Sequence, residues 1–160
     1  MVDQRAPKPE RYAALNRALA ALLEGERDWI ANLANTAALL FNELEDINWV
    51  GFYLFKHDEL VLGPFQGKPA CVRIAIGKGV CGTAAQRRAS VVVPNVHEFE
   101  GHIACDSASN SELVVPLLRG DELIGVLDLD SPCFERFDDE DRYGAEAIIR
   151  TLIAASELSR

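Results

Sequence analysis

The 160-residue sequence lacks several features that would assign it to a class of proteins. Its Lys and Arg residues form no run longer than Arg87-Arg88, and the formal net charge is -9, so we expect nucleic acid to repel the chain. The polar segment from Met1 to Arg11 has no apolar core of the kind that a secretory signal needs, and no stretch approaches a membrane span. We therefore expect a cytoplasmic protein with neither a nucleic-acid nor a membrane partner.

No two of the four cysteines form a Cys-x-x-Cys pair, because they stand at positions 71, 81, 105 and 133. Cysteines in a reducing compartment are more often free thiols, catalytic groups or metal ligands than structural disulfides. The missing pair argues against a zinc finger and against a thioredoxin-like redox site. Zinc could in principle gather Cys71, Cys81 and Cys105 with His97 and His102. No local ligand pair supports such a site, so we expect no bound metal.

Apolar residues recur at helical spacing in three stretches of the chain. The first runs from Tyr12 to Leu23. After Gly25, the second stripe consists of Ile30, Leu33, Ala34, Ala37, Leu40, Phe41 and Leu44. The third follows Asp138, which we expect to cap a helix, and repeats at positions 145, 148, 149 and 152. The sequence therefore predicts two helices that open the chain, after nine flexible residues (1–9), and one that closes it.

Between these helices the pattern changes to the period of two that is typical of β-strands. The expected strands are Asn48–Phe55, Glu59–Leu62, Cys71–Ile76, Val91–Val93, Leu113–Arg119 and Glu122–Asp130. The last two form the clearest hairpin, because Gly120-Asp121 suits a two-residue turn with positive φ. Helices at both ends of an antiparallel sheet predict an α+β fold, in a single domain that spans residues 1–160.

Gly77, Gly79 and Gly82 have the spacing of a dinucleotide-binding loop that follows a strand. That motif is weak on its own, and the next strand leads to Pro94-Asn95 instead of a ribose-binding acid. We therefore interpret these glycines as a tight turn from a strand into a helix.

The pleat of a strand assigns alternate residues to opposite faces of a sheet. In the strand that ends at Asp130, we expect one face to carry Ile124, Val126, Asp128 and Asp130 and the other to carry Leu123, Leu127 and Leu129. In the strand that starts at Asn48, one face carries Trp49, Gly51, Tyr53 and Phe55 and the other carries Val50, Phe52 and Leu54. An aromatic wall opposite acids suits a small amphipathic cation. The alternative is that the acids face solvent and the aromatic residues are ordinary packing.

The long segment from Pro94 to Ser111 has no regular pattern, and loops of this length inside a compact domain tend to carry function. It places Cys105 among small and hydrogen-bonding residues, where loop amides or a nearby cation can hold a cysteine as its thiolate. Cys105 is therefore a candidate nucleophile. The alternative is that it fills a small space in the core, as most lone cysteines do.

Five separate stretches of the chain resemble the GAF-domain free methionine-(R)-sulfoxide reductases. They are Asn-Trp-Val-Gly-Phe-Tyr from residue 48, Leu-Gly-Pro-Phe-Gln-Gly-Lys-Pro-Ala-Cys from 62, Gly-Val-Cys-Gly-Thr from 79, Gly-His-Ile-Ala-Cys-Asp-Ser from 101 and Leu-Asp-Leu-Asp-Ser from 127. Together they span most of residues 48–141. Glu100 departs from the family pattern, in which we expect proline before Gly101, and Cys133 has no role in that pattern.

This resemblance implies an enzyme on a single GAF-like domain that reduces free L-methionine (R)-S-oxide to methionine. Cys105 resembles the catalytic cysteine, Cys71 the resolving cysteine and Cys81 an auxiliary thiol. The Cys105 thiolate would attack the sulfoxide sulfur and become a sulfenic acid, which would condense with Cys71 to a disulfide. Thioredoxin would reduce that disulfide with electrons that come from NADPH, so no bound organic cofactor is needed.

The resemblance also implies a set of substrate-binding residues. Aromatic side chains would enclose the methyl end of the substrate, acids would contact its ammonium group and the sulfoxide oxygen, and loop amides would receive its carboxylate. The aromatic side chains are those of Trp49 and Tyr53. The acids are Glu112, Asp128 and Asp130. The loop amides are those of Ile103, Ala104 and Cys105. A pocket that grasps both ends of an amino acid would exclude a peptide-linked residue.

Two other functions stay open at this point. A non-catalytic GAF sensor would bind a small ligand such as a cyclic nucleotide or an amino acid, since one fold serves many roles. Sensors usually pass their signal to an attached output domain, for which 160 residues leave no room. A thiol redox switch without a substrate is the third function. The residues do not decide between a monomer and a homodimer.

Overall fold

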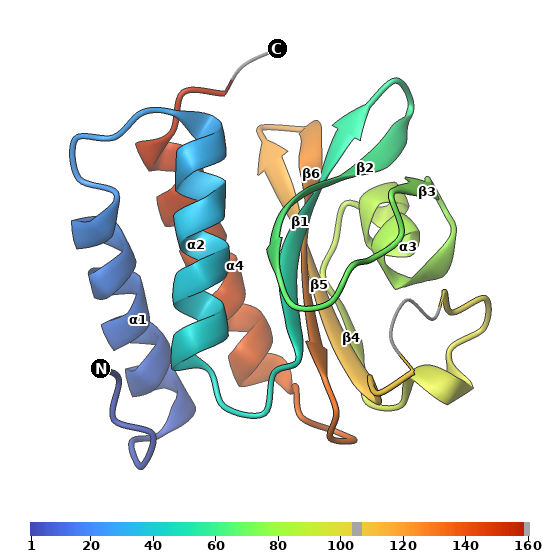
Figure 1. The fold of residues 1–160 in the computed structure, drawn as a ribbon, viewed down its shortest axis with the longest axis horizontal. Coiled ribbons are helices and arrows are strands. Elements are labelled where there is room, and N and C mark those ends of the chain that lie inside the picture. The colour runs from blue at the N-terminus through green and yellow to red at the C-terminus, as the bar shows by residue number, and fades with distance from the viewer. Residues whose placement is uncertain (104–106, 159–160) are drawn as a thin grey trace.

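The computed structural model describes residues 1–103 and 107–158, whose elements are labelled in Figure 1. The helices are α1 (Lys8–Leu22), α2 (Trp29–Glu43), α3 (Gly79–Arg87) and α4 (Asp139–Ala155), with a 3₁₀ helix, η1, at Val96–Glu98. The strands are β1 (Trp49–Lys56), β2 (Glu59–Gln66), β3 (Arg73–Ala75), β4 (Val91–Val93), β5 (Ser111–Arg119) and β6 (Glu122–Ser131).

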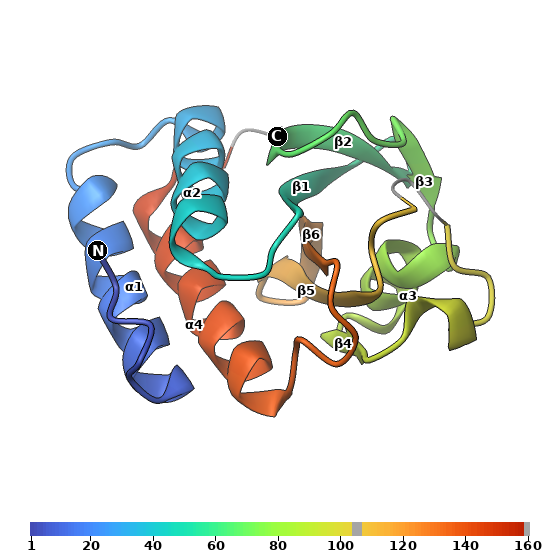
Figure 2. The same ribbon diagram turned by 60° about the horizontal axis from the view of Figure 1, so that its bottom comes forward.

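The strands form one antiparallel sheet in the order β3-β2-β1-β6-β5-β4. Helices α2 and α4 lie on one face of this sheet, with α1 packed against them on the side away from the sheet, and α3 lies on the other face (Figures 1 and 2). The predicted α+β fold, with helices from both ends of the chain packed on an antiparallel sheet, is confirmed. Among the described residues, no helix is long and apolar enough to cross a membrane.

The larger core lies between the sheet and helices α2 and α4, and it continues between these two helices and α1. Helix α2 buries only part of its predicted stripe in this core, because Ile30 is 51% exposed and Ala34 also faces solvent. Asn32 and Thr36 are buried in their place. Thr36 Oγ1 donates to the Asn32 carbonyl, and Asn32 Nδ2 donates to Ser156 Oγ. These hydrogen bonds offset the cost of burying polar groups. The spacing of apolar residues alone therefore predicted the buried face of α2 incorrectly at Ile30 and Ala34.

Strand β1 divides its side chains between the two faces as predicted. Val50, Phe52 and Leu54 pack in the core beneath the helices, whereas Trp49 and Tyr53 pack on the side of α3. The alternation is a local consequence of the pleat, and it gives the α3 side of the sheet its aromatic character.

For β6 the predicted alternation is correct from Val126 to Asp130 and wrong at the start of the strand. Leu117 pairs with Gly125 and Leu118 with Leu123, so that Ile124 is an extra residue opposite β5. This bulge reverses the alternation, because two residues of one strand then oppose a single step of the other. Leu123 consequently packs on the α3 side and Ile124 against the helix-side core.

The hairpin of β5 and β6 is confirmed, with Gly120 at φ +60° in its turn. Strand β2 is longer than predicted and β3 is shorter. The pairing of β1 with β2 shifts register between Gly51 and Tyr53, opposite the Gly63-Pro64 step. Pro64 has no N–H to donate and interrupts the strand pattern in the sequence, but the irregular pairing accommodates it.

The N-terminal parts of α1 and α4 are joined by hydrogen bonds to Asp141, the third residue of α4. Its carboxylate is 1% exposed and accepts from Tyr12 Oη (2.8 Å), Lys8 Nζ (2.7 Å) and Arg136 Nη1 (3.1 Å). It also accepts from the backbone N–H of Asp138, whose side chain caps α4 in return. One buried carboxylate therefore joins α1, α4 and the segment before α4.

We predict that Asp141→Ala lowers the free energy of unfolding by about 3–5 kcal/mol, because it removes the carboxylate partner of Arg136, which is 11% exposed, and the acceptor of the buried Tyr12 hydroxyl. Urea denaturation measures this loss. Asp139→Ala is the matched control, since Asp139 is 74% exposed and pairs with Arg142 on the surface, where we expect a change below about 1 kcal/mol. Equal midpoints for the two variants would contradict the assigned role of Asp141.

Candidate active site

A cavity lies between α3 and the sheet, on the face opposite the helical layer. It encloses about 550 Å³ of space, counted with the open solvent at its mouth. Its walls come from β1, β3, β6, the start of β5, the N-terminal end of α3 and the segments at residues 68–70, 102–103 and 109. The lining residues are Trp49, Tyr53, Lys68, Pro69, Ala70, Ile74, Lys78, Gly79, Val80, Cys81, His102, Ile103, Ser109, Glu112, Asp128 and Asp130.

Aromatic rings form one wall of the cavity. The Trp49 ring stacks on Tyr53, with centroids 6.0 Å apart, and on Phe65, with centroids 5.3 Å apart. Trp49 Nε1 donates to the Lys68 carbonyl and Tyr53 Oη donates to the Cys71 carbonyl, each at 2.9 Å. Because both polar tips are bonded to the backbone, the ring faces are held in fixed orientations toward the cavity.

A tight turn brings α3 close to the sheet. A Cβ at Gly82 would lie 2.5 Å from the Ala75 carbonyl oxygen, and the Gly77 amide donates to the Gly82 carbonyl at 2.8 Å. Only glycine fits at Gly82, which supports the interpretation of these glycines as a strand-to-helix turn. Ile103 packs over the same turn, since a Cβ at Gly79 would lie 3.1 Å from its side chain.

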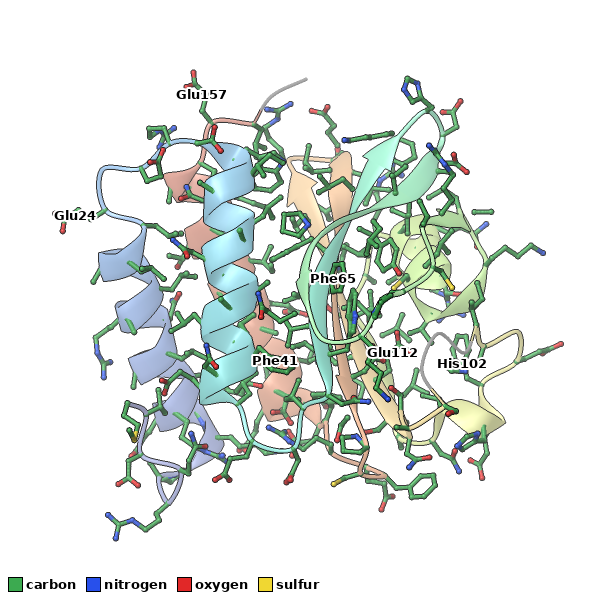
Figure 3. All side chains as sticks on the ribbon, viewed as in Figure 1. Glu24, Phe41, Phe65, His102, Glu112 and Glu157 are labelled. Carbon is green, nitrogen blue, oxygen red and sulfur yellow. The ribbon has the colours of Figure 1, made fainter. Side chains whose placement is uncertain are left out.

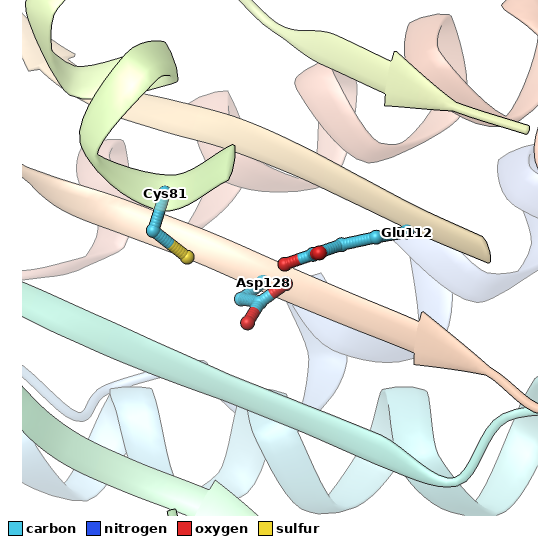
Figure 4. Close-up of side chains that lie close together, drawn as sticks. All are labelled: Cys81, Glu112 and Asp128. Carbon is cyan, nitrogen blue, oxygen red and sulfur yellow. The ribbon is translucent and has the colours of Figure 1, made fainter. Parts of the chain in front are cut away.

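Two carboxyl groups and a thiol meet at the base of the cavity (Figure 4). Ligand atoms of Glu112 on β5, Asp128 on β6 and Cys81 on α3 all lie within 4.8 Å of one another. The pairing of β5 with β6 explains why these acids lie together. Glu112 lies opposite Asp130 and Val114 lies opposite Asp128, so Glu112, Asp128 and Asp130 share one face of the sheet. Glu112 and Asp128 are 5% and 6% exposed, and their carboxyl groups are hydrogen-bonded to each other.

Burial determines the protonation of this cluster. It raises the pKa of Glu112 to about 8, and the charge of Asp130 adds to this effect, whereas the hydrogen bond with Asp128 opposes it. The pKa of Asp128 is also raised, first by burial and then by the charge of Glu112. Two carboxylates in contact without water cannot both be ionised cheaply, so the pair retains a proton at neutral pH. A neutral carboxyl can donate that proton to an oxygen acceptor in the cavity.

The Oδ1 atom of Asp128 is fully buried and has no hydrogen-bond partner among the described residues. Burying an acceptor without a hydrogen bond costs free energy of folding, and such atoms are typical of sites at which a ligand supplies the missing hydrogen bond. Asp130 also lines the cavity but is only half-buried. The acids thus differ in environment: a buried pair at the base and a more accessible carboxyl beside it.

The cysteines occupy different environments. Cys81 is a free, fully buried thiol whose pKa is raised by burial and then by Asp128 and Glu112, so the thiol is not an activated nucleophile here. Cys71 follows the cavity-lining Ala70, and it is not a free thiol. Cys133 is free and exposed, and its backbone is bonded to Ser131 and Ser111.

Most of the residues that the sequence singled out converge on this cavity. Trp49, Tyr53, Cys81, Ile103, Glu112, Asp128 and Asp130 all line it, and Cys71 adjoins it. Cys105 and Ala104 lie outside the described residues. The solvent-exposed alternative for the acids is therefore wrong for Asp128, which is buried with its carboxyl toward the cavity.

His102 is a residue that the sequence reasoning named only as a zinc candidate. Its Nε2 lies 3.5 Å from Glu112 Oε2, and its side chain is 15% exposed. Figure 3 labels both residues on the α3 side of the sheet. Because a loop brings His102 to β5, no periodicity in the sequence could have paired them. Lys68, Lys78 and Ser109 also line the cavity and were missed for the same reason.

Cys81, Glu112 and Asp128 are the group within the described ranges that could hold a metal ion. This set differs from the one that the sequence offered for zinc, because His97 is exposed and bonded to Asn110. A metal would require the buried thiol and the acids to release their protons, which burial opposes. The absence of a bound metal stays a prediction.

Comparison with known proteins shows likeness over most of the chain. The sequence pattern of the GAF domain matches residues 30–155. Free methionine-R-sulfoxide reductase from Escherichia coli (strain K12) is 57% identical over 145 residues, which are 91% of this chain and 88% of that protein. Free methionine-R-sulfoxide reductase from Neisseria meningitidis, solved in complex with its substrate, superposes with a TM-score of 0.90 at 43% identity, covering 94% of this chain and 90% of that one.

A candidate GAF sensor protein from Burkholderia vietnamiensis is similar as well, with a TM-score of 0.91 and 59% identity over 94% of this chain and 96% of that one. The fold and much of the sequence are thus shared with named reductases and with a protein named for sensing. The chemistry of the cavity must distinguish these functions.

We predict that wild-type stability falls as pH rises between about 5 and 8. The folded protein holds the Glu112 proton to about pH 8, whereas the unfolded chain loses it near the ordinary value of 4.5. The folded state therefore binds more protons in this window, and rising pH removes that stabilisation by up to about 1.4 kcal/mol per pH unit. Urea denaturation across the window measures the slope, which Glu112→Gln should reduce, while Asp128, whose pKa burial also raises, supplies the remainder.

Glu122→Gln is the matched control, because Glu122 is exposed and pairs with Arg119 on the surface. It should keep the wild-type slope. A Glu112→Gln protein whose stability varies with pH as in the wild type would show that Glu112 is ionised in the folded state.

Proposed function

Because this chain belongs to the GAF-domain free methionine-(R)-sulfoxide reductase family, we propose that it reduces free L-methionine (R)-S-oxide to L-methionine. The observation that carries this proposal is the protonated Glu112–Asp128 pair beneath an aromatic wall. A sulfoxide joins a hydrogen-bond-accepting oxygen to an apolar methyl group, and this cavity offers a neutral acid and ring faces side by side. The Neisseria relative, bound to its substrate, has the same fold.

The substrate would lie with its methyl end against Trp49 and Tyr53 and its oxygen at the Glu112–Asp128 pair. Asp130, the more accessible carboxyl, would contact the ammonium group. Backbone amides from Ile103 to Cys105 would receive the carboxylate. Contacts at both ends of a free amino acid would exclude peptide-linked methionine sulfoxide, and separate sites for methyl and oxygen would select one configuration at sulfur.

The first chemical step joins Cys105 to the substrate. Its thiolate attacks the sulfoxide sulfur while the Glu112–Asp128 pair gives its proton to the sulfoxide oxygen. The hydroxyl then moves to the cysteine sulfur as the bond between the two sulfur atoms breaks. Methionine leaves, its sulfur reduced by two electrons, and Cys105 becomes a sulfenic acid, oxidised by two electrons.

The second step resets the nucleophile. The Cys71 thiol attacks the sulfenic sulfur, water leaves and a disulfide forms between Cys71 and Cys105. Thioredoxin then reduces this disulfide with electrons from NADPH. Cys81 is an auxiliary thiol that can undergo thiol–disulfide exchange with Cys71 and Cys105. In this scheme the electrons travel through thiols, so no bound organic cofactor or metal takes part.

This activity would serve the cell during oxidative stress by recovering free methionine. A cytoplasmic location, where thioredoxin is reduced, stays a prediction, as does a homodimer. The rival function is a non-catalytic sensor that binds a small ligand in the same cavity, in line with the name of the Burkholderia relative. A sensor has no need of a redox cycle at Cys105, which gives the two functions different outcomes in one assay.

We predict NADPH oxidation in an assay that contains thioredoxin, thioredoxin reductase and the (R)-sulfoxide epimer of free methionine. The (S) epimer and N-acetylated methionine sulfoxide should give rates at the level of the blank, because they cannot satisfy the oxygen site and the ammonium site respectively. Methionine formed is quantified by chromatography, so that its ratio to NADPH consumed can be compared with one.

Cys105→Ser should bind the substrate but give no methionine, whereas Cys133→Ser is the matched control and should turn over as the wild type does. A wild-type protein that binds methionine sulfoxide without producing methionine would establish the sensor and refute the reductase. Full activity of Cys105→Ser would remove Cys105 as the nucleophile.

A further inference from the structure

The proposed chemistry leaves the buried acid pair one proton short after each turnover, and the following inference rests on that proposal. When the Cys105 thiolate forms, its proton goes to solvent. When the sulfoxide oxygen leaves as the hydroxyl of the sulfenic acid, it carries away a proton of the Glu112–Asp128 pair. The pair must regain a proton from solvent before the next substrate reacts, although its own side chains are almost completely buried.

His102 lies between this pair and solvent. Its Nε2 is 3.5 Å from Glu112 Oε2, within a small side-chain rotation of a good hydrogen bond, and apo active sites often show such long distances. At 15% exposure the ring reaches solvent, whereas the Glu112 side chain is 7% exposed. An imidazole can accept a proton at one nitrogen and release one at the other, so this position suits a relay.

The other ionisable groups at the cavity are less suited to this task. They are Tyr53 on β1, Lys68 after β2, Lys78 before α3, Cys81 on α3, and Asp128 and Asp130 on β6. Cys81 is completely buried and cannot reach solvent, and the Tyr53 hydroxyl is bonded to the Cys71 carbonyl. A lysine ammonium has no lone pair and can take up a proton only after it has become a neutral amine, whereas an imidazole next to Glu112 can accept and donate at its two nitrogens.

Burial also lowers the pKa of His102. At neutral pH the ring and the Glu112 carboxyl are therefore both neutral, and they do not form a fixed ion pair. A neutral imidazole next to a neutral acid can take up a proton from solvent briefly and pass it to a carboxylate that has just lost one.

We propose that His102 is the proton relay that restores the Glu112–Asp128 pair between turnovers. The proposed binding mode gives His102 no contact with the methyl group, the ammonium group or the carboxylate of the substrate, so its loss should slow turnover more than it weakens substrate binding. This split between kcat and KM separates a relay from a residue that merely shapes the cavity.

The test uses His102→Gln, whose amide can still hydrogen-bond to Glu112 but cannot carry a proton. We expect the first methionine, released from fully reduced protein without thioredoxin, to form at a rate within about threefold of wild type. With thioredoxin raised until the rate no longer depends on it, kcat should fall about tenfold or more, with KM within about threefold. The pH optimum should move downward, because solvent protons must now reach the pair directly.

Two further variants sharpen the result. His102→Ala leaves space for a small base, and added imidazole should restore much of its lost kcat. His97→Gln is the matched control, since His97 is exposed and its ring is bonded to Asn110 at 2.8 Å. It should keep the wild-type kcat and show no response to imidazole.

The inference is overturned if His102→Gln keeps the wild-type kcat and pH profile. It is equally overturned if kcat of His102→Ala is low and imidazole leaves it unchanged, which would indicate a structural role. Failure of the proposed function looks different, because the wild-type protein itself would then release no methionine in any of these assays.

Discussion

A proton held between two buried carboxyl groups, those of Glu112 and Asp128, is the constraint around which the cavity is arranged. Each part of the surroundings contributes to it. The register of β5 and β6 places the two acids on one face, α3 covers them with the Cys81 thiol, and Asp130 adds a negative charge beside them. Because neither the Cys81 thiol nor the Asp130 carboxyl supplies a compensating positive charge, protonation is the least costly way to keep the pair buried.

The larger hydrophobic core and the cavity lie on opposite faces of the sheet. On one face, three helices bury the larger core, and a carboxylate that accepts hydrogen bonds from two cations, that of Asp141, joins α1 to α4. On the other face, α3 and the loops leave a cavity in which burial raises the pKa of the Glu112 and Asp128 carboxyls. The same residue type therefore stabilises the fold on one side and can serve as an acid on the other.

Local regularities explain how much of this could be predicted from the sequence. The period of two in β1 and β6 placed Trp49 and Tyr53 on one face, and Asp128 and Asp130 together on one face, because the pleat is set by neighbouring residues. The alternation failed at Ile124, because the bulge there depends on how β6 pairs with β5.

Features that depend on distant residues were beyond periodicity. Glu112 came only from the family resemblance, because its place beside Asp128 follows from cross-strand pairing. His102 reaches Glu112 through a loop, and loops have no repeat that a sequence pattern can reveal. The protonation of the pair depends on burial, which arises only once α3 packs over the sheet.

Carbon-13 NMR titration of the Glu112 side-chain carboxyl, assigned with the Glu112→Gln protein, tests the central claim most directly. We predict a protonated carboxyl at neutral pH that ionises near pH 8, and a signal of the ionised form throughout pH 5 to 8 would contradict it.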